Sequence, residues 1–298
     1  MTLRKKLCPT PNALASGQTA TFDMPLGLRY HVIWLEIGYD GTNTNKKTAT
    51  TSVLDTTNEI VGDIRVKING KVQRVHTACQ LNQINGSNGS AFALKTSGAM
   101  GSTGYRECIP IFFAEPWRQN DDEVRMSAWN LAGPGVESFQ IEVDFKTITS
   151  PYLSGFYEFE PATGVLGSIA KCIRQTVGVG GTVQDFNTID RRDFLQAIHL
   201  WPTVEGTPHY VNKLKLTANG VEMQDVLTSV ENQAVLLGRG MNPDTAAVPR
   251  FDLVMDYDDP IAGALPLGGL NELTLHVEYN TTVTGNMVMA IIRAGPPE

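Results

Sequence analysis

The stretch Asp63-Ile64-Arg65-Val66-Lys67-Ile68-Asn69-Gly70 alternates apolar and polar residues and ends in an Asn-Gly pair. Alternation with a period of two predicts a β-strand with one buried face, and Asn-Gly is a strong signal for a hairpin turn. The same design returns 150 residues later as Lys213-Leu214-Lys215-Leu216-Thr217-Ala218-Asn219-Gly220. The sequence therefore predicts one hairpin design in each half of the chain.

A second pair of strands supports this repeat. Phe139-Gln140-Ile141-Glu142-Val143-Asp144-Phe145 is echoed 134 residues later by Leu273-Thr274-Leu275-His276-Val277-Glu278-Tyr279. Solenoids and propellers repeat at roughly 20–50 residues, so this period indicates two tandem β domains instead. Such a duplication usually serves the geometry of an assembly rather than chemistry.

The rest of the chain is also typical of an all-β protein. Many short alternating runs are separated by Gly- and Pro-rich turns, which favours sandwiches or barrels. One short helix is predicted near the junction, over Gly164–Val177, because apolar residues recur there at helical spacing. We expect an N-terminal arm over residues 1–18, a first domain over 19–155 and a second over 156–298.

Composition and charge exclude several classes of protein. The 298 residues are 42% hydrophobic and 18% charged, and the formal net charge is −7. Residues 151–298 carry 9 Lys and Arg against 17 Asp and Glu, so no direct contact with nucleic acid is expected. The only basic run is Arg4-Lys5-Lys6, followed by Pro9 and Pro11. We interpret it as an extended arm, either solvated or touching an acidic or lipid surface.

Four scattered cysteines, Cys8, Cys79, Cys108 and Cys172, form neither a zinc motif nor a disulfide framework. Most are expected to be small buried hydrophobic residues in a reducing compartment. No apolar run is long enough to span a membrane, and no secretory signal follows the N-terminal charges.

Two long polar stretches interrupt the first half, over Gly38–Asn58 and Asn82–Gly104. Loops beyond about 12–15 residues are uncommon inside a compact domain. We expect both to project from the surface, and the Ser- and Gly-rich Asn82–Gly104 to be too polar to fill a core.

No catalytic, cofactor-binding or metal-binding residue is predicted, and the protein is not expected to be an enzyme. Ser168-Ile169-Ala170-Lys171 matches a serine acylation motif, but its partner motifs are missing or out of order. Asp256, Asp258 and Asp259 are the best candidates for a hard cation such as calcium. The alternative interpretation, a solvated acidic turn, is favoured.

The run Cys108-Ile109-Pro110-Ile111-Phe112-Phe113-Ala114-Glu115-Pro116-Trp117-Arg118 lies in a chain with two similar β halves. Together these features resemble the double jelly-roll major capsid proteins of tailless icosahedral bacteriophages with an internal membrane. The second half departs from the motif, with Met255-Asp256-Tyr257-Asp258-Asp259-Pro260 at the corresponding place.

The resemblance implies two eight-stranded antiparallel jelly rolls and a pseudo-hexagonal homotrimer that tiles the virus shell. Its implied partners are copies of itself, vertex (penton) and minor capsid proteins and, through the N-terminal arm, any internal viral membrane. The protein would be made in the host cytoplasm and located in the virion, without a cofactor. Its family has no catalytic residues to transfer.

Two other classes compete with this interpretation. A lectin-like tandem β-sandwich could stack sugars on Trp117, Trp201 or Tyr257. A cupin-type enzyme would need clustered histidines, but His31, His76, His199, His209 and His276 are scattered along the sequence.

Overall fold

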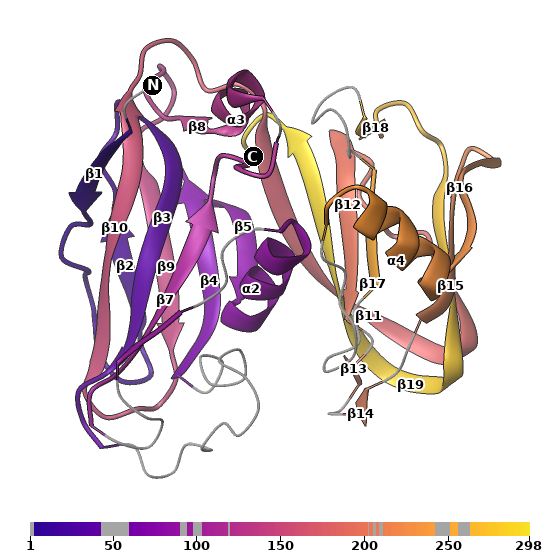
Figure 1. Ribbon diagram of the computed structural model, residues 1–298, viewed down its shortest axis with the longest axis horizontal. Coiled ribbons are helices and arrows are strands. Elements are labelled where there is room, and N and C mark those ends of the chain that lie inside the picture. The colour runs from indigo at the N-terminus through magenta and orange to yellow at the C-terminus, as the bar shows by residue number, and fades with distance from the viewer. Residues whose placement is uncertain are drawn as a thin grey trace. The chain divides into compact units, whose positions relative to one another are not determined.

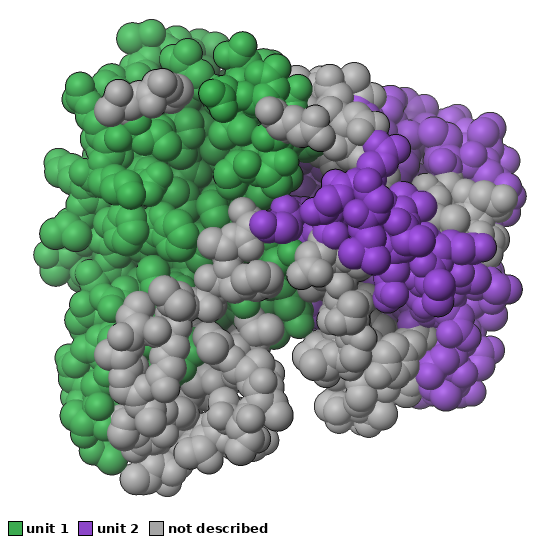
Figure 2. All heavy atoms as spheres, viewed as in Figure 1, with its two compact units in different colours: residues 1–86, 90–169, 296–298 green, residues 87–89, 170–295 purple. Residues whose placement is uncertain are grey.

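The computed structural model describes residues 3–42, 60–89, 94–97, 103–118, 120–201, 203–204, 207–208, 211–241, 251–255 and 263–298. The chain divides into two compact units, which Figure 2 colours separately. Unit 1 comprises residues 1–86, 90–169 and 296–298, and unit 2 comprises residues 87–89 and 170–295. The main division falls after Ile169, later than the expected boundary after residue 155, because the strand that follows Pro151 pairs inside unit 1.

Along unit 1 the chain forms β1 (Arg4–Leu7), β2 (Thr19–Asp23), β3 (Leu28–Tyr39), β4 (Val61–Ile68), β5 (Lys71–Thr77), α2 (Ala78–Ser87), β6 (Leu94–Ser97), β7 (Tyr105–Phe112), α3 (Asp121–Ser127), β8 (Trp129–Asn130), β9 (Phe139–Phe145) and β10 (Pro151–Pro161). One antiparallel sheet has the order β1-β10-β3-β7-β6, with β8 beside β3. The order β5-β4-β9-β2 forms the second layer (Figure 1).

Unit 2 is built from β11 (Ile169–Phe186), β12 (Phe194–Trp201), β13 (Thr203–Val204), β14 (Thr207–Pro208), β15 (Val211–Ala218), β16 (Val221–Thr228), α4 (Ser229–Gly238), β17 (Phe251–Val254), β18 (Leu265–Pro266) and β19 (Leu273–Gly295). The first part of β19 pairs with β15, and its last part pairs with β12. Strand β12 also pairs with β17 and β18. The all-β prediction is therefore confirmed.

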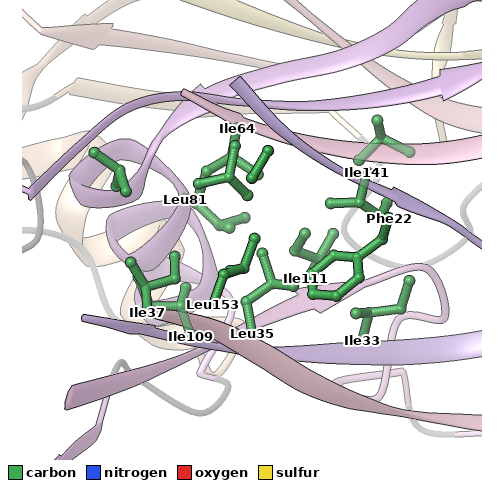
Figure 3. Packing of buried hydrophobic residues seen from close by; sticks show 14 of the residues in the cluster. Phe22, Ile33, Leu35, Ile37, Ile64, Leu81, Ile109, Ile111, Ile141 and Leu153 are labelled. Atoms are coloured by element: carbon green, nitrogen blue, oxygen red, sulfur yellow. The ribbon is translucent and has the colours of Figure 1, made fainter. Parts of the chain in front are cut away.

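Each unit has its own apolar core, supplied by alternate residues of the strands. In β9, Phe139, Ile141, Val143 and Phe145 are buried while the residues between them are half-exposed, as the period of two predicts. Figure 3 shows Ile141 in the unit 1 core with side chains of both layers, among them Leu35 and Ile64. In unit 2 the corresponding strand part buries Leu273, Leu275, Val277 and Tyr279.

The predicted Asn-Gly hairpins are present in both units. Asn69 and Gly70 join β4 to β5 with φ values of 52° and 76°, and Asn219 and Gly220 join β15 to β16 with φ values of 49° and 75°. Two consecutive residues with positive φ are typical of the tight turn that suits a twisted hairpin, and Asn and Gly tolerate that conformation best.

The helix predicted over Gly164–Val177 is wrong. Strand β11 occupies this region from Ile169 onward. Ile173, Val177 and Val179 are β-branched, and such residues pack well on a pleated sheet, which outweighs the helical spacing of the apolar positions.

The loop predicted over Asn82–Gly104 is also partly wrong. Its first residues belong to α2, and Leu94–Ser97 form β6. Asn82, Asn85 and Ser87 are at most 4% exposed, so this polar segment is buried. Burial is tolerated because the amides are hydrogen-bonded, as Asn85 is to the backbone oxygen of Pro110 at 3.0 Å. Residues 90–93 and 98–102, like 43–59 of the other polar stretch, lie outside the described residues.

The N-terminal arm is a paired strand rather than a free extension. Arg4 to Leu7 pair antiparallel with Phe159 to Phe156 of β10, and the Cys8 amide donates to the Gly155 oxygen at 2.9 Å. Pro9 and Pro11 come after this strand and so do not interrupt its hydrogen bonds.

All four cysteines are free thiols. Cys172 is buried, and the other three are half-buried. Burial raises the pKa of Cys8 to about 12 and that of Cys108 to about 11, so both remain protonated near neutral pH.

Candidate assembly surface

Helix α4 lies on the side of β12 and β17 that faces away from the main core of unit 2. Its Leu236 packs with Ala197, Val254 and Ile292, whereas the main core takes the alternate strand residues such as Ile198. Alternate residues of a strand point to opposite faces, so α4 covers the outer face of this sheet. Figure 1 shows the helix across these strands.

Buried polar groups fix α4 to that sheet. Asn232, 2% exposed, donates from Nδ2 to the backbone oxygen of Asp252 at 2.7 Å. The Asp252 carboxylate lies 2.6 Å from Nδ1 of His199, and both residues are 2% exposed. A buried, hydrogen-bonded pair of this kind holds one helix position, because any shift would leave polar groups without partners.

The helix begins at a capping box. Thr228 accepts from the Glu231 amide at 3.2 Å, and the Glu231 carboxylate accepts from the Thr228 amide at 2.8 Å. This reciprocal pair satisfies two amides that have no partner inside a helix.

Exposed apolar residues gather on α4 and on the strand before it. Among the described residues of unit 2, the exposed large apolar side chains are Val183, Phe194, Val221, Met223, Val230, Val235 and Leu237. Five of these seven belong to β16 or α4, which contact each other. Single exposed apolar residues are normal, whereas a concentration of them marks an interaction surface.

Unit 1 presents a different kind of surface on β4 and β9. Arg65 lies 2.9 Å from Glu142 and 2.5 Å from Asp144, and Lys67 lies 2.5 Å from Glu142. Desolvation by itself would raise the pKa of Glu142, but hydrogen bonds from Lys67 and Arg65 outweigh it and hold the pKa below its usual value. This charge ladder keeps the outward face polar, and it offers no apolar anchor to a partner.

The Phe-Ala-Glu-Pro-Trp-Arg motif closes the end of β7. The Phe113 and Ala114 amides both donate to the His31 oxygen, at 2.8 and 2.9 Å. The Phe113 ring lies in the core, 4.8 Å from the Trp129 ring. Glu115 pairs with Arg118 at 2.7 Å. The motif therefore anchors a loop, and its function is structural.

The sequence motifs for chemistry are not assembled into a site. Ser168 is exposed, while Lys171 is 2% exposed and pairs with Asp193 at 2.6 Å. Within the described ranges, no group of three or more His, Cys, Asp or Glu residues is placed to hold a metal ion. Asp256, Asp258 and Asp259 lie outside the described residues. No helix in the described part of the chain is both long and apolar enough to span a membrane.

Of the three aromatic residues considered for sugar stacking, the two that the structure describes are not exposed. Trp201 is only 6% exposed, and Trp117 is half-buried with its ring 6.0 Å from Phe112. Tyr257 lies outside the described residues. The lectin-like alternative would need an exposed Trp201, whereas this residue is buried at the end of β12.

The sequence carries a local signal for each of the helices α2 and α4. Thr77-Ala78-Cys79-Gln80 and Thr228-Ser229-Val230-Glu231 both match the capping-box pattern. In α2, Gln80 accepts from the Thr77 amide at 3.1 Å, and Thr77 accepts from the Gln80 amide at 3.2 Å. These four-residue patterns directly after each hairpin predict the two helices.

Solved structures with the same fold cover nearly the whole chain. The major capsid protein P2 of bacteriophage PM2 matches with a TM-score of 0.77 and 14% identity, over 99% of this chain and 97% of that one. The major capsid protein of Sulfolobus turreted icosahedral virus matches with a TM-score of 0.65 and 13% identity, over 99% and 96%. VP54 of PBCV-1 matches with a TM-score of 0.65 and 11% identity, over 98% and 93%.

These matches identify the architecture as the double jelly roll, as the resemblance implied. The model of the viral coat protein P2 N-terminal domain matches residues 5–160, which is just over half of the chain. The chain therefore belongs to the viral coat protein P2 family. No curated protein sequence matches it.

Proposed function

We propose that this chain is the major capsid protein of an icosahedral virus and that three copies form a pseudo-hexagonal tile of the shell. The observation that carries the proposal is the family match over unit 1, combined with a second unit that repeats the hairpin and helix of the first. Three chains of two similar units present six similar sides, and this is the shape that packs into a flat facet. The PM2 and Sulfolobus virus proteins of the same fold are major capsid proteins.

The partners and location follow from this role. The protein acts in the virion shell after synthesis in the host cytoplasm, and it contacts copies of itself, vertex proteins and minor capsid proteins. It acts without catalysis and without a cofactor. Direct contact with nucleic acid is not part of the proposal, because Arg65 and Lys67 of β4 are paired with carboxylates of β9 and the chain is acidic.

We further propose that the N-terminal strand faces the membrane if the virus has one. Every residue of β1 is exposed, and Lys5, whose side chain is 68% exposed, keeps its contact with Glu158 at 3.1 Å. Arg4, Lys5 and Lys6 would each favour anionic headgroups by about 1 kcal/mol at low salt. Co-sedimentation with anionic vesicles would test this, and equal binding to neutral vesicles would contradict it.

The oligomeric state tests the main proposal. Light scattering coupled to size-exclusion chromatography should give the mass of three chains at micromolar concentration. We expect each contact between subunits to bury more than about 2,000 Å², in the range of permanent assemblies. A homogeneous monomer would contradict the proposal.

A further inference from the structure

The outward side of α4 is apolar, although it faces solvent. Val230, Ala234 and Leu237 follow the helical spacing of four and three residues, so they line one side of the helix; we call them the α4 stripe. Val230 is 72% exposed and Leu237 is 60% exposed. The buried residues Asn232 and Leu236 lie on the opposite side. A surface helix normally turns polar residues to solvent, so the α4 stripe indicates a missing partner.

The equivalent helix of unit 1 has the reverse pattern. Helix α2 also has ten residues and also follows a hairpin and a capping box. Its Gln80, Asn82 and Gln83 are polar, yet each is at most 9% exposed. In a single chain, the more polar of the two equivalent helices is therefore buried, and the more apolar one is exposed to solvent.

The hydrogen bonds show that the two helices are equivalent parts of the repeat. Asn85 of α2 donates to the backbone oxygen of Pro110, and Asn232 of α4 donates to that of Asp252. Pro110 and Asp252 are 142 residues apart, the same offset that relates Phe113 to Met255 at the ends of their strands. Both helices are therefore fixed by an amide to the same place on the corresponding strand.

We propose that a second copy of this chain covers the α4 stripe, which then forms the apolar centre of the contact between neighbouring subunits. This inference rests on the proposed homotrimer and names the residues that hold it together. Val235 of the same helix and Val221 and Met223 of the neighbouring β16 are exposed as well, but they do not belong to the α4 stripe.

A second copy is the partner that fits the observations. A coat protein meets copies of itself at high local concentration. The helix that follows the hairpin is buried in unit 1, and we expect its equivalent in unit 2 to be buried in the assembled protein. A specific interface buries at least about 1,000 Å², more than a few aliphatic side chains supply. The α4 stripe is therefore the centre of a larger contact, and apolar anchors at a centre carry most of the binding energy.

The test is the double substitution Val230→Glu with Leu237→Lys. A carboxylate in the first turn and an ammonium in the last turn both suit the helix dipole, so the helix stays folded in the monomer. The net charge is unchanged. Two charges facing an apolar contact should weaken trimer formation by at least about a hundredfold, seen by light scattering as a shift from trimer to monomer.

A matched control places the same charges on exposed apolar residues of unit 1. Val165→Glu with Met126→Lys replaces side chains that are 67% and 65% exposed in unit 1. This control should remain trimeric, and both variants should keep the circular dichroism spectrum of the wild type. Dissociation of the control to the same degree would overturn the specific role of α4.

The remaining outcomes separate this inference from the proposed function. A monomeric wild type would overturn the trimer itself. A trimeric wild type with an equally stable trimeric double variant would overturn only the role of the α4 stripe. If that trimeric variant then failed to form particles with the other coat proteins, the occupant of the stripe would be one of those proteins.

Discussion

A single asparagine closes the Asn-Gly hairpin of each unit and also holds a neighbouring loop. The Asn69 side-chain oxygen accepts from the Glu137 and Ser138 amides at 2.7 and 3.2 Å. In unit 2, Asn219 accepts from the Asn271 and Glu272 amides at 2.8 and 3.0 Å. Sequence analysis predicted the turns but not this second role, because a hydrogen bond across more than 50 residues leaves no local pattern.

Substitution of Asn219 separates the two roles. Asn219→Gly keeps the positive φ and removes only the two accepted hydrogen bonds, so it should cost about 1–3 kcal/mol of unfolding free energy. Asn219→Ala should cost roughly 1–2 kcal/mol more, since alanine is strained at this φ. Urea denaturation measures both values. Equal stability of the two variants would show that the backbone conformation has no influence here.

The carboxyl group of Asp190 should make the stability of unit 2 depend on pH in the acid range. Arg192 hydrogen-bonds its carboxylate and Arg293 lies 3.1 Å away, and these interactions lower the pKa of Asp190 to about 2. A carboxyl with a lowered pKa stabilises the fold above its unfolded pKa of about 3.9, and this contribution is lost as the pH falls toward 2.

Asp190→Asn should therefore cost about 1–2 kcal/mol at pH 7, after allowance for solvent screening of this partly exposed group. At pH 2 the variant and the wild type should have nearly the same stability. Thermal melting between pH 2 and pH 7 measures the difference. A penalty independent of pH would mean that the side-chain shape, rather than its charge, stabilises the loop.

At the scale of elements, the alternation of apolar residues predicted the strands, whereas the helices α2 and α4 are indicated only by the capping-box patterns at their first residues. In β9 and β15, one face is buried and the other is not, so the alternation appears directly in the sequence. Helix α2 buries amide side chains together with Ala78, Leu81 and Ile84, and its Asn85 hydrogen-bonds the backbone oxygen of Pro110, 25 residues further along the chain. A helix that is buried on its polar side as well does not show the usual alternation between an apolar and a polar face. The helical spacing at Gly164–Val177 was misleading because only tertiary pairing decides between helix and strand for such a run.

Strand β1 should be dispensable for folding. Its residues are all exposed, and it lies at the edge of its sheet, where β10 remains paired with β3 without it. Deleting residues 2–7 should therefore leave a folded trimer with a slightly lower melting temperature, while shell assembly or membrane attachment weakens. Circular dichroism and vesicle binding measure the two effects. An unfolded truncated protein would show that β1 is part of the core, and normal particles would show that it has no role in assembly.

At the scale of the whole molecule, the repeat restricts how copies can join. A contact that pairs the α4 stripe of one chain with the α4 stripe of the next is self-complementary and stops at a dimer, whereas a contact between the stripe and a different surface of the next chain can close a ring. The α4 stripe is exposed, whereas the equivalent helix α2 is buried apart from its half-buried Cys79, so the two units do not present the same surface and the second arrangement is favoured. The trimer is thus expected to use one contact three times.

Ring closure then predicts the species seen on dilution. A closed trimer has three contacts for three chains, whereas a dimer has one contact for two chains. Each chain is therefore bound less tightly in the dimer than in the trimer. Native mass spectrometry over a dilution series should therefore show trimer giving way to monomer, with dimer a minor species throughout. The Val230→Glu, Leu237→Lys variant should reach the monomer at a concentration at least about a hundredfold higher than the wild type does. A predominant dimer at any concentration would indicate a self-complementary contact and would contradict the ring.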